Sequence, residues 1–257
     1  MPNDPNQPPA EDDEFFVGYF PTPPGQTRFV AVMAIVMVLL TAGFAYGATA
    51  FQRHPGTGRV VDYGRSLTGL VLVEPEPMLR YLDEETGEVR TTLLAGGSKT
   101  GVGRNVRSRA GDILTVRGPF LERQGGTYME VYGVQDGELP PEVVARLTAV
   151  EAEDLGMVTL SGEIVDGKCW YGRMKPGGGR THRPCAQLCL LGGVPPVLIT
   201  HHLDGSRGHY VLADAQGRAV GREVLPFVAL PVEVRGRLER RGDLRILKVD
   251  PDRIRRR

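Results

Sequence analysis

The chain contains three cysteines, and all of them fall between positions 169 and 189. One histidine lies among them, so this short segment carries Cys169, His182, Cys185 and Cys189. Three thiolates and one imidazole form a standard tetrahedral ligand set for zinc, and thiolates also hold copper(I). Clustered cysteines of this kind indicate a local site, and an odd count leaves at least one of them unpaired within the chain.

Three kinds of chemistry fit these residues. The first is a metal site, with zinc or copper as the ion. The second is a disulfide from Cys169 to Cys185 or Cys189, which is common in proteins outside the cytoplasm. The third is a reactive thiol, because a helix N-terminus and nearby cations such as Lys168 and Arg173 lower a thiol pKa. The spacing suits the metal and the disulfide equally.

The elements that must position these residues are a strand, a loop and a short helix. Thr181 is a good N-cap, Pro184 is tolerated in a first turn, and Gly192 and Gly193 favour a helix end, which predicts a helix over 182–191.

On that helix His182, Cys185 and Cys189 stand at i, i+3 and i+7, and therefore on one face. Cys169 ends a preceding strand, and the loop after it is rich in glycine. We therefore predict that the four side chains converge.

A weaker indication concerns the loop itself. Gly177, Gly178 and Gly179 lead into a helix N-terminus beside Arg180 and Arg183, an arrangement able to hold an anion, although a solvated loop explains it as well. A second glycine-rich stretch, Gly97-Ser98-Lys99-Thr100-Gly101, lacks the pattern of a phosphate-binding loop.

Composition excludes several functions. The 31 basic and 31 acidic residues balance, which argues against a nucleic-acid partner. The chain has no haem-attachment, zinc-protease or serine-hydrolase motif. Glycine (34) and proline (20) are frequent, which favours short strands joined by turns.

Residues 29–51 carry no charge, and a helix of this length spans a bilayer. A cleaved signal peptide is the alternative, although the leading segment is acidic and not basic. Residues 1–28, rich in proline and acids, are expected to be disordered.

Arg53, Arg59 and Arg65 follow the span, which by the positive-inside rule would place the body in the cytoplasm. Long domains often escape this rule, and we expect a single-pass protein with an extracytoplasmic body.

An internal repeat organises the body. Leu67-Thr68-Gly69 matches Leu160-Ser161-Gly162, and the stretch beginning Val116-Arg117-Gly118 matches the stretch beginning Val234-Arg235-Gly236. This pattern predicts a mainly β body of two related, OB-like barrel units, at 58–136 and 157–253. The linker at 137–156 contains a short amphipathic helix.

The second copy is longer by about 25 residues, roughly the size of the cysteine segment. Because function resides in sites grafted onto folds, this surplus is the place to expect it.

The stretch from Gly162 to Gly193 resembles a group of small bacterial envelope domains of no established activity. They share a strand like Gly-Glu-Ile-Val-Asp, then a cysteine like Cys169, then H-x-x-C-A-x-x-C as at His182 to Cys189, then Gly-Gly. The resemblance implies a compact β-barrel and a location in the cell envelope.

These observations predict a membrane-anchored accessory or binding module in preference to an enzyme. Its Cys/His site is either a disulfide-stapled element or a metal site, and its partners are the membrane and another envelope or membrane protein. The alternative is a thiol-redox or electron-transfer component of a membrane-associated complex.

Overall fold

The computed structural model describes residues 24–51, 58–202 and 207–257, and it divides the chain into two units, Met1–Pro55 and Gly56–Arg257. Among the described residues of the first unit there is one helix, α1 (Pro24–Phe51), and it is long and apolar enough to cross a membrane, a property that signal sequences share. The helix begins at Pro24 instead of Phe29, because proline is pre-organised for a first helical turn. Most of the predicted tail lies outside the described residues.

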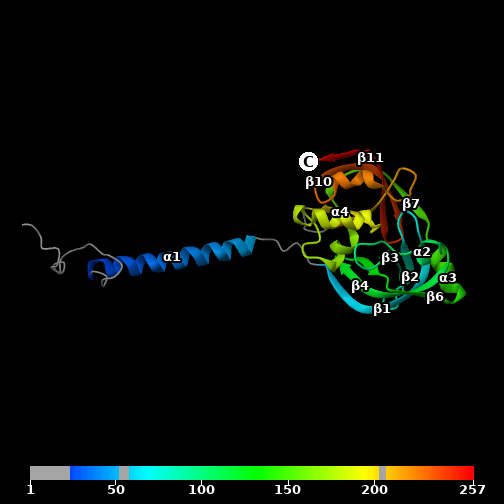
Figure 1. Ribbon diagram of the computed structural model, residues 1–257, viewed down its shortest axis with the longest axis horizontal. Coiled ribbons are helices and arrows are strands. Elements are labelled where there is room, and N and C mark those ends of the chain that lie inside the picture. The colour runs from blue at the N-terminus through cyan, green and yellow to red at the C-terminus, as the bar shows by residue number, and fades with distance from the viewer. Residues whose placement is uncertain (1–23, 52–57, 203–206) are drawn as a thin grey trace, which may run out of the picture. The chain divides into compact units, whose positions relative to one another are not determined.

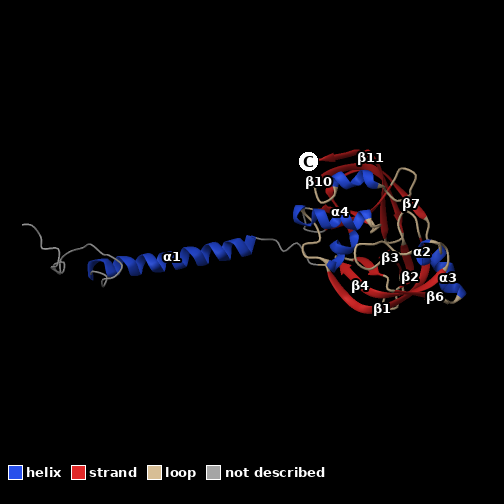
Figure 2. Ribbon diagram, viewed as in Figure 1, coloured by secondary structure: helices blue, strands red, loops and turns tan. Residues whose placement is uncertain are grey.

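The second unit is built almost entirely of strands, with a few short helical segments (Figures 1 and 2). Its first half contains the strands β1 (Arg59–Leu72), β2 (Met78–Leu82), β3 (Val89–Ala95), β4 (Ile113–Arg123) and β5 (Gly126–Glu130). They pair in the order β1-β2-β3-β5-β4, and β4 pairs again with β1, which closes a barrel. Outside this barrel, β6 (Gly133–Asp136) extends the sheet along β4. The short helix α2 (Arg104–Arg107) lies between β3 and β4, and α3 (Pro141–Thr148) is the predicted linker helix.

The second half is also a closed barrel. Its strands are β7 (Ala152–Asp166), β8 (Pro196–His201), β9 (Arg207–Ala213), β10 (Pro231–Arg241) and β11 (Leu244–Arg256), and a 3₁₀ segment, η3 (Arg222–Phe227), precedes β10. The pairing order is β7-β8-β9-β11-β10, the same as in the first barrel. In each barrel the third and fifth strands along the chain pair in parallel: β3 with β5, and β9 with β11. The prediction of two small barrels is confirmed. The second begins and ends slightly beyond the predicted 157–253, because long strand pairing continues at both ends.

The glycines of the matched motifs lie at corresponding places in the two barrels. A Cβ on Gly69 would lie 2.2 Å from the carbonyl oxygen of Arg80, and a Cβ on Gly162 would lie 2.2 Å from that of Ile199. Each glycine is on the first strand of its barrel and faces the second strand closely. A side chain has no room there, which gives a physical reason for glycine at both positions.

Alanine at Gly162 is therefore expected to lower the free energy of unfolding by about 1–3 kcal/mol, since the backbone of β8 must move away. Alanine at Gly133 is the matched control, because its Cβ would approach nothing closer than 3.7 Å. Chemical denaturation of both variants checks this. Equal stabilities would show that the close approach has no energetic consequence.

One of the hydrophobic clusters contains residues of both barrels, and each barrel also has a cluster of its own. Met78, Leu121 and Tyr128 of the first barrel belong to the same buried cluster as Val165 and Val197 of the second. Cys169, Trp170 and Cys189 are members of this cluster too. The cysteine segment is thus packed where the barrels meet, and its burial depends on both of them.

The extra residues of the second barrel form one insertion. Residues 73–77 join β1 to β2, whereas residues 167–195 join β7 to β8, a difference of 24 residues that agrees with the predicted surplus. The insertion contains a π-type turn, η1 (Cys169–Arg173), a 3₁₀ turn, η2 (Arg180–His182), and the helix α4 (Arg183–Leu191). The predicted helix is confirmed, but Thr181 makes no capping hydrogen bond, because it already lies inside the 3₁₀ turn.

Candidate metal centre

The sulfur atoms of the three cysteines converge. Cys169 comes from η1, and Cys185 and Cys189 come from α4; the three Sγ atoms all lie within 4.8 Å of one another. Cys169 and Cys189 are buried and Cys185 is half-buried. All three are free thiols in this structure. The predicted approach of Cys169 to the helical cysteines is confirmed.

His182 is buried beside this group but belongs to a second cluster. Its ligating atom lies within 4.8 Å of those of Cys169 and Asp166, and its Nε2 is 2.9 Å from Oδ2 of Asp166. Cys169 is therefore shared between a sulfur cluster and an Asp–His cluster. The prediction that His182 shares one stripe with the helical cysteines holds only in part, because η2 winds more tightly than an α-helix and turns His182 away from the ideal position.

Asp166 is the residue that sequence reasoning missed. Its carboxylate is fully buried, and Oδ1 accepts a hydrogen bond of 2.8 Å from the backbone N–H of Cys169 while Oδ2 contacts His182. One carboxylate thus orients both the turn that carries Cys169 and the imidazole. The only signal in the sequence is its place at the end of the Gly162–Asp166 strand.

The thiols of Cys169 and Cys189 are hydrogen-bonded to each other. Cys169 donates a hydrogen bond to Cys189, and this contact, with burial and the charge of Asp166, raises the pKa of Cys169 well above its usual range. The same hydrogen bond lowers the pKa of Cys189, an effect that burial opposes and that Lys99 and Lys168 reinforce. Of the two thiols, Cys189 is therefore the one that loses its proton more readily.

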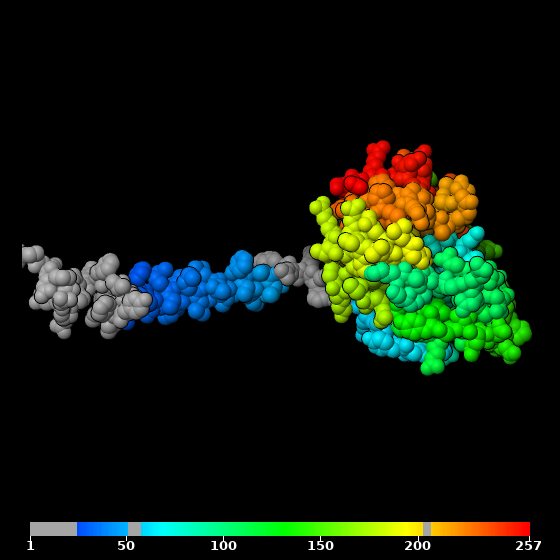
Figure 3. All heavy atoms as spheres, in the orientation of Figure 1, coloured from blue at the N-terminus to red at the C-terminus, as the bar shows by residue number. Residues whose placement is uncertain are grey.

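The first barrel supplies the positive charge. Lys99, in the loop after β3, donates a hydrogen bond of 2.8 Å from Nζ to Sγ of Cys185, which raises the Lys99 pKa. This loop lies against the insertion, as the adjoining green and yellow surfaces show (Figure 3). Gly101 donates its N–H to the carbonyl of Gly192, at the end of α4, at 2.8 Å. Residues 97–101 lack the pattern of a phosphate loop, and nothing in the sequence indicated that Lys99 would contact the cysteines.

A buried ion network supports the insertion from the same side. Nζ of Lys168 donates to the carbonyl oxygens of Gly96, at 2.9 Å, and Ser98, and it lies 3.3 Å from a carboxylate oxygen of Glu130. Nε of Arg173 lies 2.9 Å from the other oxygen of Glu130. The start of the insertion is thus held by a carboxylate on β5.

The loop of Gly177, Gly178 and Gly179, which the sequence suggested as an anion site, packs against other residues of the chain. A Cβ on Gly177 would lie 2.4 Å from the carbonyl oxygen of Cys169, and Gly178 faces the ring of Trp170. The N–H of Gly179 donates to Glu163, and Arg183 donates to the carbonyl of Pro226 at 3.1 Å. The glycines therefore allow the loop to pack against η1. Arg180 is exposed at the start of η2.

Comparison with known proteins found no matching protein family, no matching curated protein and no matching solved structure. The function must therefore be argued from the geometry of the site.

The arrangement suits a soft metal ion. Zn–S bonds of about 2.3 Å in a tetrahedral site place the sulfurs about 3.8 Å apart, which is compatible with three sulfurs within 4.8 Å. Thiolate ligands select zinc and copper(I) over hard cations such as magnesium or calcium.

Proposed function

We propose that this chain is a membrane-anchored binding module whose body holds zinc or copper(I) through Cys169, Cys185 and Cys189. The observation that carries the proposal is the convergence of three free sulfur atoms from two separate elements, all within 4.8 Å. Packing alone does not require three buried or half-buried thiols at this place, because small apolar side chains would fill the same space. A metal ion, in contrast, would use all three as ligands.

His182 is the fourth donor in this proposal, which requires its imidazole to move toward the sulfurs on metal binding, because here it groups with Asp166 and Cys169 and not with Cys185 and Cys189. Its Nε2 is engaged by Asp166, which leaves Nδ1 as the ligating atom. Histidines that bind metals almost always donate their other ring N–H to a carboxylate or carbonyl, and this second contact fixes the tautomer. Asp166 is therefore a positioning residue for His182, and its second oxygen positions Cys169 as well.

The membrane part of the proposal rests on α1. An uncleaved helix of this length and composition anchors the body, which we place outside the cytoplasm, with another envelope or membrane protein as its partner. The metal would hold the insertion together at the junction of the barrels, where Lys99 of the first barrel contacts Cys185. The role is therefore that of an accessory module and not of an enzyme.

A specific observation favours thiol redox chemistry as the second candidate. Three free thiols lie within 4.8 Å of one another, so that a pair of them can close to a disulfide, and the half-buried Cys185 accepts a hydrogen bond from the cationic Lys99, which favours its thiolate. In this alternative, two thiols of the chain are oxidised to a disulfide while a disulfide of a partner protein is reduced to two thiols, so that electrons and protons balance.

Alkylation followed by mass spectrometry of the full chain, purified in detergent, separates the candidates. In the metal-bound protein we expect one ion per chain and all three cysteines to resist iodoacetamide until a chelator and denaturant are added. A single alkylated cysteine after denaturation without reductant would instead reveal a disulfide. Rapid alkylation of Cys185 in the native, metal-free protein would favour the redox candidate.

A further inference from the structure

A cavity of about 190 Å³ lies in the body, and none of its lining residues belongs to either cluster of metal-ligating atoms. It is bordered by the β1–β2 connection, α2, the end of α4 and η3, so both barrels contribute to it. Most drug-sized ligands occupy about 300–1,000 Å³, so this volume suits a smaller molecule.

Glu76 is the unusual residue in its wall. This glutamate is 5 % exposed and lines the cavity. Within the described part of the chain, no hydrogen bond or ion pair joins its carboxyl group to another residue. Burial raises the pKa of Glu76 to about 8, and the charge of Arg107 opposes this shift. A buried carboxyl group without a partner is costly, and a ligand that donates hydrogen bonds would remove that cost.

Two arginines supply the opposite charge. Arg107 lines the cavity and uses Nε and Nη2 in long hydrogen bonds to the carbonyls of Val102 and Gly193, at 3.3 and 3.4 Å. Its guanidinium retains further N–H donors, since the group has five. Arg222 also lines the cavity and is exposed at its edge.

The remaining wall is mostly aliphatic. It consists of side chains from the end of α4, the start of β8 and the segment through η3: Leu190, Leu191, Val194, Pro196, Val220, Val224 and Leu225. The cavity therefore combines one buried acid, two bases and an apolar surface. An amine alone would leave the arginines unused and would be repelled by them, and a carboxylic acid alone would leave Glu76 without a cationic partner.

We propose that this cavity binds a small zwitterion with an aliphatic side chain, of the chemical class of leucine or valine. The ammonium group bonds to the carboxylate of Glu76, the ligand carboxylate faces Arg107 and Arg222, and the side chain contacts the leucines and valines. Because Glu76 is largely protonated at neutral pH, binding of an ammonium group releases a proton. The site is independent of the metal proposed at the cysteines.

Isothermal titration of the full chain in detergent with L-leucine tests this, beside 3-methylbutylamine, 4-methylpentanoate and L-glutamate. We expect saturable 1:1 binding of leucine only, with proton release at pH 7 seen by comparing two buffers. Glu76→Gln should weaken binding at least about tenfold and abolish the proton release. Glu74→Gln is the matched control, an exposed glutamate on the same connection that does not line the cavity.

Arg222→Ala should also weaken leucine binding, and because this residue is exposed the variant keeps its fold. The proposal is overturned if leucine fails to bind at millimolar concentration, if either the amine or the acid binds as tightly as leucine, or if Glu76→Gln binds leucine like the parent chain.

Discussion

Replacing Cys189 with serine is expected to abolish stoichiometric binding of zinc or copper(I). Cys189 is 1 % exposed, its sulfur lies within 4.8 Å of the two others, and its pKa is lowered by the hydrogen bond from Cys169. Serine keeps the size but is a poor ligand for soft ions. Metal analysis and thermal melts of detergent-purified protein, with and without chelator, measure the result.

The expected loss of stability is large and depends on the metal. Structural zinc contributes about 10–16 kcal/mol of binding free energy in zinc-finger peptides, and here a substantial part of such a term would stabilise the insertion. The metal-free parent chain is the control, because serine in the apo protein should cost only a small amount. If the chelator leaves the parent's melting temperature unchanged, no structural metal is present.

His182→Ala and Asp166→Asn extend this test to the second cluster. Loss of the fourth ligand should release the ion, and loss of the carboxylate that orients it should weaken metal binding by about 10–100-fold. If the three cysteines bind the ion alone, as a trigonal copper(I) site would, both variants should retain the metal. A melting temperature lowered to the same extent with and without metal would assign His182 a packing role only.

Replacing Glu130 with glutamine is expected to destabilise the body by about 3–5 kcal/mol. The side chains of Glu130 and Lys168 are 2 % and 3 % exposed, so the variant leaves a buried ammonium group without its counter-charge. Arg173 loses its partner as well. Because the insertion begins at this network, cysteine alkylation of the metal-free variant should also be faster. Denaturant unfolding and alkylation rates measure the two effects.

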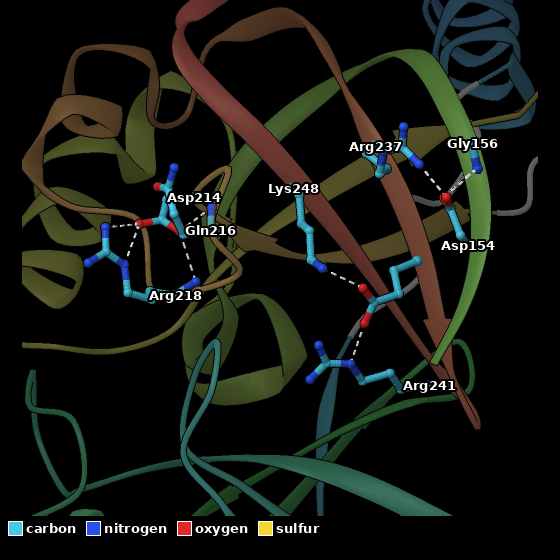
Figure 4. A network of polar contacts seen from close by, with 9 residues as sticks. Asp154, Gly156, Asp214, Gln216, Arg218, Arg237, Arg241 and Lys248 are labelled. Carbon is cyan, nitrogen blue, oxygen red and sulfur yellow. Dashed lines mark hydrogen bonds and ion pairs between the residues drawn. The ribbon is translucent and has the colours of Figure 1, made fainter. Parts of the chain in front are cut away.

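An exposed ion pair provides the control. Asp154 on β7 contacts Arg237 on β10 and accepts the N–H of Gly156, and both side chains of the pair are more than half exposed (Figure 4). Asp154→Asn should therefore leave the stability nearly unchanged. A comparable loss in both variants would contradict the idea that burial makes the Glu130 network costly to break.

Local patterns in the sequence were sufficient for much of the architecture. Twenty-three uncharged residues at 29–51 require a long helix. The H-x-x-C-A-x-x-C spacing and the glycines at 192 and 193 predicted α4, because helical periodicity and helix ends depend on neighbouring residues. The matched Leu-Thr-Gly and Leu-Ser-Gly motifs predicted two barrels with the surplus in the second, because each motif marks a strand that faces another closely.

The surroundings of the site depended on the tertiary structure. Lys99 reaches Cys185 across 86 positions of sequence, and Lys168 reaches Gly96 across 72. No periodic pattern encodes such a contact, because it exists only once both barrels have closed and pack together in one hydrophobic cluster. Asp166 and Glu76 depend on the tertiary structure in the same way, because each is an ordinary acid in the sequence. Burial by residues distant along the chain lets Asp166 bind His182 and Cys169. Burial of the same kind leaves Glu76 as an unpaired carboxyl group in a cavity.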